Sequence, residues 1–337
     1  MHTEQHHDEN SAGVFFTELG IPEPQYNLAI SGGHHGAMTG RMLEAIEEVL
    51  LTEQPDWVLI YGDTNSTLAG ALAAVKLHIP VAHVEAGLRS FNMRMPEEIN
   101  RIVADRLSTL LLCPTDTAVR NLASEGRHEG VHNVGDVMYD VSLFSAARAE
   151  DTSQILGRLE LTPGSFALAT CHRAENTDDA DRLRGILEAL GDIAAAMPVI
   201  LPLHPRAHKQ IASFGLGNLL TPLTVIDPVP FLDMVALEKN ARVILTDSGG
   251  VQKEAFFYRV PCITMRDETE WVETVACGWN TIVGAGRDRI VSAALHQPRP
   301  AAAEANPYGD GQASNMILKL LLEATLARTA DAAHTAA

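Results

Sequence analysis

The sequence is poor in the features that mark several common classes of protein. Its 337 residues include four cysteines, which are scattered without a C-x-x-C pair, as is typical of buried thiols in a cytosolic protein. No apolar run approaches the roughly 20 residues of a membrane span, and the N-terminus lacks the apolar core of a signal peptide. We therefore expect a cytoplasmic protein with no membrane as its partner.

Positive charge is also scarce. The chain has 25 Lys and Arg residues against 43 Asp and Glu residues, which gives a formal net charge of −18. This excess of acidic side chains argues against a broad nucleic-acid surface and against adhesion to an anionic membrane. We expect no nucleic-acid partner, and any phosphate must be bound locally.

The chain does contain a regular alternation of short apolar runs and longer amphipathic stretches, which predicts βαβ units and parallel sheets. The length fits two domains of roughly 150 residues, so the fold class we expect is α/β with two Rossmann-like domains. The runs in the first half are Trp57–Tyr61, Ile79–Val84, Thr109–Cys113 and Val131–Val134. Those in the second half are Phe166–Thr170, Val199–Leu203, Leu223–Ile226, Arg242–Thr246, Pro261–Thr264 and Thr281–Val283.

A polar stretch, Ala146–Thr162, separates the two sets of strands and indicates the domain boundary. We expect an N-terminal domain over residues 1–147, a C-terminal domain over 148–308, and a helix over 309–330 that packs back on the N-terminal domain. The first half has only four strand candidates against six in the second. Because the first strand of a doubly wound sheet is a central one, we expect a gap or an exposed edge in the N-terminal sheet.

The second half carries a candidate phosphate site. Asp247-Ser248-Gly249-Gly250 follows an apolar strand and precedes a helical run, so free backbone N–H groups and a positive dipole end would face an anion. Glu254 would lie one turn into that helix, where a carboxylate can bind ribose hydroxyls. The alternative is an ordinary strand-to-helix turn.

His204-Pro205-Arg206 also follows a strand, at the edge where parallel sheets bind ligands. A histidine and an arginine there suit a phosphate leaving group. A surface histidine without any such role is the alternative.

Three carboxylates occupy analogous places in the first half: Asp63 and Glu85 end strands, and Glu97 opens a helix. Asp63 could simply cap the next helix, and Glu97 could serve the helix dipole. Glu85 is not expected to cap a helix, because it follows an apolar strand and precedes Ala86-Gly87. Several acids that converge on one strand edge are what proton abstraction and return require.

In this order and spacing, the motifs resemble those of the non-hydrolysing UDP-N-acetylglucosamine 2-epimerases, from about Gln5 to Arg328. The segments that carry the resemblance are Gly62-Asp63-Thr64, His83–Arg89, Pro96–Arg101, Val134-Gly135-Asp136, His172–Asn176, His204-Pro205 and Thr246–Glu254.

The resemblance implies a fold like that of two-domain (GT-B-like) glycosyltransferases with the active site in the interdomain cleft, a homodimer, and neither a metal nor a cofactor. It implies interconversion of UDP-GlcNAc and UDP-ManNAc for cell-surface polysaccharide precursors, by anti elimination and re-addition of UDP. By motif position it assigns catalytic roles to Asp63, Glu85, Glu97 and His204. It assigns UDP-sugar binding to Arg89, Arg94, Arg173, Asn176, Arg206, Ser248, Gly249, Gly250, Glu254 and Arg266.

The chain departs from the family pattern in three places. About 30 residues with a Gly-Xaa-Arg-Pro loop would precede its start, Met234 stands where many members have an aromatic residue near the uracil, and Trp271-Val272 replaces an Arg-Pro pair. The last change and the segment Ser90–Met95 resemble the branch that acts on UDP-2,3-diacetamido-2,3-dideoxyglucuronate, whose carboxylate Arg94 could pair with.

Two further alternatives stay open. A glycosyltransferase of the same fold would use the phosphate site without needing three carboxylates. A non-catalytic remnant that binds UDP weakly or not at all would fit the missing start.

Overall fold

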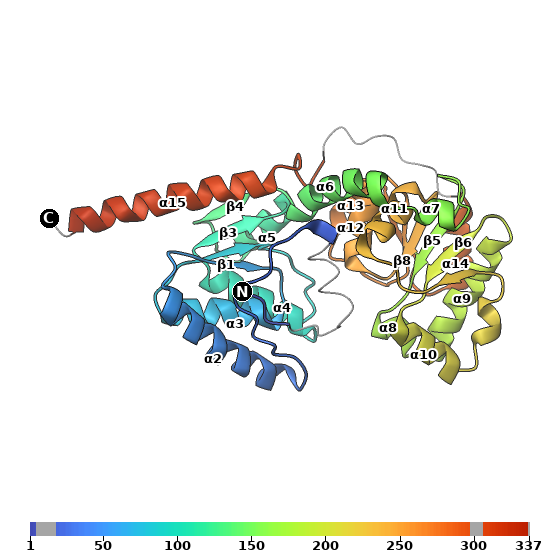
Figure 1. Ribbon diagram of the computed structural model, residues 1–337, viewed down its shortest axis with the longest axis horizontal. Helices are drawn as coiled ribbons and strands as arrows, with labels where there is room; N and C mark the ends of the chain where they lie inside the picture. The colour runs from blue at the N-terminus through green and yellow to red at the C-terminus, as the bar shows by residue number, and fades with distance from the viewer. Residues whose placement is uncertain (5–17, 297–305, 336–337) are drawn as a thin grey trace. The chain divides into compact units, whose positions relative to one another are not determined.

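The computed structural model describes residues 1–4, 18–296 and 306–335, with side chains up to residue 330 (Figure 1). The chain divides into two compact units, Met1–Asp140 with Asn306–Ala337 and Val141–Ala305, called unit 1 and unit 2 below. The division falls early in helix α6 (Val137–Thr152). The polar stretch that indicated a boundary near residue 147 continues this helix and includes α7 (Ile155–Arg158), and both helices bury part of the stretch.

Unit 1 contains a four-stranded parallel sheet in the order β1-β2-β3-β4, so the four predicted strands are confirmed. The first three strands are short and mostly apolar because both faces of the sheet are covered by helices, whereas β4 at the edge is more polar. The strands are β1 (Val58–Tyr61), β2 (Val81–Val84), β3 (Leu110–Cys113) and β4 (Val131–Asn133). The helices between and around them are α2 (His35–Glu53), α3 (Asn65–Lys76), α4 (Pro96–Leu107) and α5 (Asp116–Ser124).

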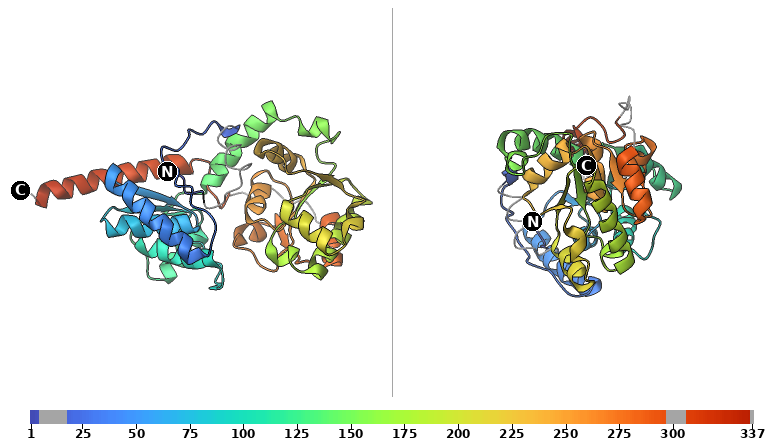
Figure 2. Two further views of the ribbon diagram at one scale, coloured as in Figure 1. Left: turned by 60° about the horizontal axis from the view of Figure 1, so that its bottom comes forward. Right: turned by 90° about the vertical axis from the view of Figure 1, so that its right-hand side faces the viewer.

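The two faces of this sheet have separate cores. On one face α2 and α3 lie side by side, and their buried Met42, Ile46 and small alanines pack against Ile60 and Val81. On the opposite face lies α15 (Ala313–Thr335), which packs through Ile317 (Figures 1 and 2). The last helix of the chain is therefore part of unit 1.

Strand β1 forms one edge of this sheet. It pairs with β2, and no other strand of the described residues pairs with it. Tyr61 at its end is 58% exposed. Residues His2 and Asn27 form an isolated parallel bridge outside the sheet, and Leu28 packs on the core beside α2. Strand β1 is thus an edge strand, and the gap expected from the strand count stays a prediction.

Unit 2 contains a six-stranded parallel sheet in the order β10-β9-β8-β5-β6-β7, which confirms the six predicted strands. One face is covered by α9 and α14, whose leucines and isoleucines form its main core. The strands are β5 (Ala167–Thr170), β6 (Val199–Pro202), β7 (Thr224–Ile226), β8 (Val243–Thr246), β9 (Cys262–Thr264) and β10 (Asn280–Ile282). The helices are α8 (Ala174–Thr177), α9 (Ala180–Ala194), α10 (Pro205–Ser213), α11 (Phe231–Asn240), α12 (Gly249–Phe257), α13 (Val272–Ala276) and α14 (Arg287–His296).

The strand order of unit 2 reverses between β8 and β5. In sheets of this kind ligands bind outside the carboxyl ends of the strands at the point where the order reverses. The loops that follow β5 and β8 are therefore the expected ligand-binding loops of unit 2. No helix of the described residues is both long and apolar enough to cross a membrane.

Candidate functional site

In unit 1, Asp63 lies directly after β1 and is held by Arg101 of α4. The Arg101 Nη2 atom lies 2.6 Å from Asp63 Oδ2. Asp63 does not cap α3, because Thr64 is the N-cap residue and its backbone N–H donates to Thr67 Oγ1. The capping alternative for Asp63 is therefore excluded, and its carboxylate is available for another role.

Glu98, one residue beyond the predicted Glu97, organises the loop before α4. Its carboxylate accepts hydrogen bonds from the backbone N–H groups of Ser90 and Phe91, both at 2.9 Å, and from Arg101 at 2.7 Å. Burial by itself raises the pKa of Glu98, but these hydrogen bonds outweigh burial and lower it. Glu98 therefore holds the loop before α4 in place, a role that the sequence alone did not show.

Glu97 and Arg94 are left more accessible by this arrangement. Glu97 is half-buried in the first turn of α4, and neither residue forms an ion pair within the described part of the chain. The Arg94 side chain is exposed, and its backbone N–H donates to Asn92 Oδ1. The loop thus presents one free carboxylate and one free guanidinium.

Glu85, which follows β2, has an unusual backbone conformation. Its φ of 73° lies in the left-handed region, which costs a non-glycine residue on the order of 1 to 3 kcal/mol. The side chain lies over Gly62, because a Cβ atom on that glycine would sit 3.4 Å from Glu85 Oε2. Glu85 and Asp63 are therefore gathered at the carboxyl ends of two paired strands.

A buried network supports this strand edge from behind. Asp105 of α4 accepts hydrogen bonds from His83 at 2.7 Å and from Arg89 at 2.7 Å, and the other ring nitrogen of His83 lies 2.8 Å from Gly62 O. Burial by itself raises the pKa of Asp105, but His83 and Arg89 outweigh it and lower it. His83 and Asp105 were missed as candidates, because nothing in a single sequence shows which buried polar groups meet.

Arg89 belongs to this network and does not join the three predicted carboxylates. Its Nε and Nη2 atoms bind both oxygens of Glu125 at 2.7 and 2.8 Å, and its Nη1 also donates to Leu88 O. The residue is 6% exposed. In this structure every donor group of Arg89 is used inside unit 1, so it positions the loop after β2 rather than facing a ligand.

In unit 2, the predicted phosphate site lies at the N-terminus of α12. It consists of Ser248, Gly249 and Gly250 and is called the cradle below. Ser248 is the N-cap residue, and its backbone N–H donates to Thr246 Oγ1 at 2.9 Å. The first turn of α12 contains no acidic residue, so its N–H groups and the positive end of the helix dipole are suited to an anion. Gly249 is required by close packing, because a Cβ atom would lie 3.2 Å from Trp271 Nε1, whereas Gly250 is exposed.

Asp247 joins this cradle to the loop after β5. It is fully buried, and its carboxylate accepts hydrogen bonds from the backbone N–H groups of His172 and Arg173 and from Asn176 Nδ2, at 3.0 to 3.1 Å. Asn176 is also buried and donates to Met265 O. Asn176 therefore positions the loop, while the exposed Arg173 side chain reaches within 4.0 Å of a Cβ atom on Gly249.

Two histidines face each other across the ends of β5 and β6. The ring centroids of His172 and His204 are 5.4 Å apart, and His172 Nδ1 lies 3.5 Å from Asp247 Oδ1. Burial lowers the pKa of His172. His204 Nδ1 accepts the backbone N–H of Arg206 and so caps α10. His172 was not singled out from the sequence, although its position after β5 is the same signal that identified His204.

A cavity of about 210 Å³ lies beside these histidines. It is lined by Met234, the residue at the predicted uracil position, and by Val251 of α12. The other lining residues are Thr170, Cys171, His172, Pro202, His204, Pro228 and Val229. An apolar cavity beside a helix N-terminus is suited to a flat base joined to phosphate groups.

The remaining predicted cations of unit 2 are committed to other contacts. Arg206 donates to Thr177 Oγ1 and pairs with Asp178. Arg266 is 5% exposed and pairs with Glu270. Among the described residues, neither guanidinium has a recorded contact with the cradle of α12.

Glu254 lies on α12 at the cradle. A Cβ atom on Gly250 would lie 3.9 Å from Glu254 Oε2, and the residue is 9% exposed. Burial raises the pKa of Glu254 to about 7, although the neighbouring Lys253 opposes the shift. In the described part of the chain, no group of three or more metal-ligating side chains is placed to hold a metal ion.

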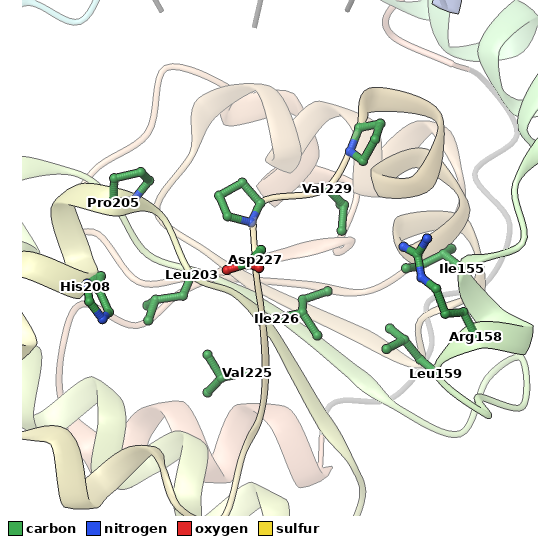
Figure 3. A pocket seen from close by; sticks show the side chains of 12 residues that line it. Ile155, Arg158, Leu159, Leu203, Pro205, His208, Val225, Ile226, Asp227 and Val229 are labelled. Atoms are coloured by element: carbon green, nitrogen blue, oxygen red, sulfur yellow. The ribbon is translucent and has the colours of Figure 1, made fainter. Parts of the chain in front are cut away.

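A second cavity of unit 2, of about 760 Å³, shares the lining residues Pro228 and Val229 with the cavity beside the histidines (Figure 3). Side chains of β7 and of the loop after it surround it, including Val225, Ile226 and Asp227, with Arg158 at one side. None of the predicted site residues lines this cavity. Its size alone therefore gives it no place in the candidate site.

Comparison with known proteins identifies close relatives. Residues 1–322 match the family described as UDP-N-acetylglucosamine 2-epimerase. The chain is 55% identical over 326 residues to the UDP-2,3-diacetamido-2,3-dideoxy-D-glucuronate 2-epimerase of Pseudomonas aeruginosa, covering 95% of this chain and 90% of that protein. It is 44% identical to the UDP-N-acetylglucosamine 2-epimerase of Methanocaldococcus jannaschii, covering 95% of this chain and 90% of that protein.

Solved structures agree with this result. The crystal structure of the M. jannaschii UDP-GlcNAc 2-epimerase in complex with UDP-GlcNAc and UDP superposes with a TM-score of 0.86 at 44% identity, covering 96% of this chain and 91% of that chain. An α,α-trehalose 6-phosphate synthase from Burkholderia multivorans matches with a TM-score of 0.56 at 11% identity, covering 91% of this chain and 78% of that chain, which shows a common fold alone.

Proposed function

This chain belongs to the UDP-N-acetylglucosamine 2-epimerase family and is a UDP-sugar 2-epimerase, and we propose that its sugar is UDP-2,3-diacetamido-2,3-dideoxyglucuronate. The observation that carries the choice of sugar is the 55% identity, over 95% of the chain, to an epimerase named for that substrate. The sequence motifs alone favoured UDP-N-acetylglucosamine as the substrate. The comparisons instead favour UDP-2,3-diacetamido-2,3-dideoxyglucuronate. UDP-N-acetylglucosamine is the second candidate, because the relative named for it is 44% identical.

The proposed chemistry begins with the carboxylates of unit 1. A carboxylate removes the proton from C2, the bond between C1 and the diphosphate oxygen breaks, and UDP leaves with the electron pair, so that a C1=C2 double bond forms. UDP then adds back to C1 while a second acid returns a proton to the opposite face of C2. Asp63, Glu85 and Glu97 supply more than one group for these two proton transfers, as the reaction requires.

The supporting groups of unit 1 keep these carboxylates in place. Arg101 binds Asp63, and the strained backbone of Glu85 directs its side chain over Gly62. Fixed positions matter because a proton transfer requires hydrogen-bond reach between the base and C2. Arg89 and Asp105 contribute by fixing the loop after β2.

Unit 2 supplies the proposed UDP site. The backbone N–H groups of Gly249 and Gly250, which follow the N-cap residue Ser248, bind the diphosphate, and the positive end of the α12 dipole stabilises it as a leaving group. Glu254 accepts hydrogen bonds from ribose hydroxyls. His204 and His172 lie at the ends of the neighbouring strands and assist the departing diphosphate. The proposal requires both units to act on one substrate molecule, and the homodimer stays a prediction.

The test is incubation of the purified protein with UDP-2,3-diacetamido-2,3-dideoxyglucuronate in deuterated water, without any acceptor. We expect the C2 epimer to form and to carry deuterium at C2. A requirement for an acceptor would favour a glycosyltransferase, and the absence of both conversion and UDP binding would favour a non-catalytic remnant. Conversion that retained the original hydrogen would exclude the elimination mechanism.

A further inference from the structure

Unit 1 contains a buried histidine whose ring is bound on both sides. His83 lies in β2 and is fully buried. Its Nδ1 atom lies 2.7 Å from Asp105 Oδ1, and its Nε2 atom lies 2.8 Å from Gly62 O. The proposed chemistry gives this ring no role. A buried ionisable group in a polar network beside the candidate catalytic carboxylates needs an explanation.

Both partners of the ring are hydrogen-bond acceptors. The Gly62 carbonyl oxygen can only accept, so Nε2 of the ring carries a proton. Asp105 Oδ2 accepts from Arg89 Nη1 at 2.7 Å and from the Gly87 N–H group at 3.2 Å, and these donors favour an ionised carboxylate. Asp105 Oδ1 is then an acceptor as well, so Nδ1 carries the second proton. In this geometry His83 is an imidazolium.

The charges of the surrounding groups agree with this assignment. Arg89 pairs with both Asp105 and Glu125, so the network holds two carboxylates against one guanidinium. A charged His83 supplies the second cation, whereas a neutral ring would leave one carboxylate of the network unbalanced. The nearby Cys113 thiol adds no charge, since burial raises its pKa to about 12. A balanced set of charges is the less costly one in a buried place.

The contact with Gly62 fixes the end of β1. The Gly62 N–H group donates to Val84 O at 3.1 Å, and its carbonyl accepts from His83, so both backbone groups of this glycine are bound by β2. The Gly62 carbonyl belongs to the peptide bond that leads into Asp63. On the same residue, a Cβ atom would lie 3.4 Å from Glu85 Oε2. The orientation of this one glycine therefore bears on both carboxylates of the strand edge.

We propose that His83 is a positioning residue: its charged ring ties the end of β1 to α4 through Gly62 and Asp105. Asp63 and Glu85 are thereby held where they can exchange protons with C2 of the sugar. This inference rests on the proposed function, in which these two carboxylates act on the sugar. Loss of the bond to Gly62 should slow the proton transfers, because a small misplacement of a catalytic group lowers the rate steeply. UDP binding, which the proposed function places in unit 2, should stay unchanged.

The experiment compares two variants that each keep one of the ring's contacts, with UDP-2,3-diacetamido-2,3-dideoxyglucuronate as the substrate. The amide of His83→Gln reaches the position of Nε2 and can donate to Gly62 O, whereas that of His83→Asn reaches only the position of Nδ1, beside Asp105. We expect kcat to fall about 100-fold in His83→Asn and to stay within about tenfold of the wild type in His83→Gln. KM should change little in either variant.

Two comparisons separate positioning from a merely structural role. His128→Asn and His128→Gln change an exposed histidine of the same unit and should leave kcat unchanged. If His83 only filled space, its two variants would lose thermal stability, yet their kcat values, measured well below both melting temperatures, would be equal. Equal kcat values in the two variants, or a raised KM with an unchanged kcat, would overturn the proposal.

Nuclear magnetic resonance tests the ring directly in the wild type, without reliance on the folding of any variant. With isotope-labelled histidine at the pH of the activity assay, His83 should show two slowly exchanging ring N–H protons, one on each nitrogen. A ring nitrogen without a proton would overturn the inference.

The same method keeps the inference separate from the proposed function. A wild type that failed to convert the sugar would remove the proposed function. The carboxyl carbon signal of Glu85 should nevertheless shift in His83→Asn and stay in place in His128→Asn. An unshifted Glu85 signal in His83→Asn would overturn the positioning role whether or not the protein is an epimerase of this sugar.

Discussion

The two units have the same kind of parallel sheet, but the carboxyl ends of their strands carry opposite chemistry. In unit 1 the strand ends carry Asp63 and Glu85, which are held by Arg101 and by a strained backbone. In unit 2 the corresponding edge carries the N-terminus of α12, whose first turn has no acidic residue, and two facing histidines. In the function that we propose, unit 1 therefore supplies the proton chemistry and unit 2 supplies the binding of UDP.

The variant expected to have the largest effect is Glu85→Gln, which tests whether unit 1 supplies the proton chemistry. We expect kcat to fall by about 10² to 10⁴ with little change in KM, because a positioned acid or base contributes about that much to the rate. The affinity for UDP, measured by calorimetry, should stay unchanged. Glu129→Gln, a change at an exposed carboxylate of the same unit, is the control. Near wild-type turnover by Glu85→Gln would remove Glu85 from the catalytic group.

The two units should also respond to pH in opposite directions. Asp105 and Glu98 of unit 1 have lowered pKa values, so their contribution to stability is present above their unfolded pKa of about 4 and is lost as the pH falls further. Glu254 of unit 2 has a pKa raised to about 7, so its contribution is present below about pH 4.5 and is lost as the pH rises through 7. A shift of this size corresponds to about 3 kcal/mol.

Hydrogen exchange can measure this contrast within one molecule. Amides of β3 should lose protection first on acidification below about pH 4, whereas amides of β8 should lose protection as the pH rises from about 5 to about 8 after correction for intrinsic exchange. Equal responses of the two sheets would show that the buried carboxyl groups do not govern the stability of either unit.

The choice of sugar is tested at Arg94. If its exposed guanidinium pairs with the carboxylate of the uronate, Arg94→Ala should reduce the preference for the uronate over UDP-N-acetylglucosamine by about 10- to 100-fold in kcat/KM, from about 1.5 to 3 kcal/mol of pairing. Arg106→Ala, which removes another exposed arginine of unit 1, is the matched control. If Arg94→Ala left the ratio of kcat/KM values for the two sugars unchanged, other residues would determine the choice of sugar.

The smallest effect is expected in the cradle of unit 2, where two adjacent glycines differ in their surroundings. Gly249→Ala places a Cβ atom 3.2 Å from Trp271 Nε1, whereas Gly250→Ala places one 3.9 Å from its nearest neighbours. We expect Gly249→Ala to weaken UDP binding by about tenfold, or about 1.4 kcal/mol, without lowering kcat at saturation. Gly250→Ala should have a smaller effect. The reverse order would contradict the placement of Gly249 in the cradle.

Much of the candidate site was predictable because it follows strand ends. A residue directly after an apolar strand of a parallel sheet must lie at the carboxyl edge, so Asp63, Glu85 and His204 could be chosen without a structure. The same rule applies to His172, which was overlooked. Arg89, Asn176 and Arg266 were chosen by motif position, yet the structure buries them and pairs them with Glu125, Asp247 and Glu270.

The sequence by itself determined the ten strands, their grouping into sets of four and six, and the family, because short apolar runs and ordered motifs are local signals. Only the tertiary structure decided which polar groups are used up inside each unit and which stay free. Glu98 binds the loop before α4 while Glu97 does not, and Asp247 binds the backbone of the loop after β5. These pairings depend on how distant segments pack. The sequence shows that a residue is Asp or Glu, but it does not show which group lies beside that carboxylate in the fold.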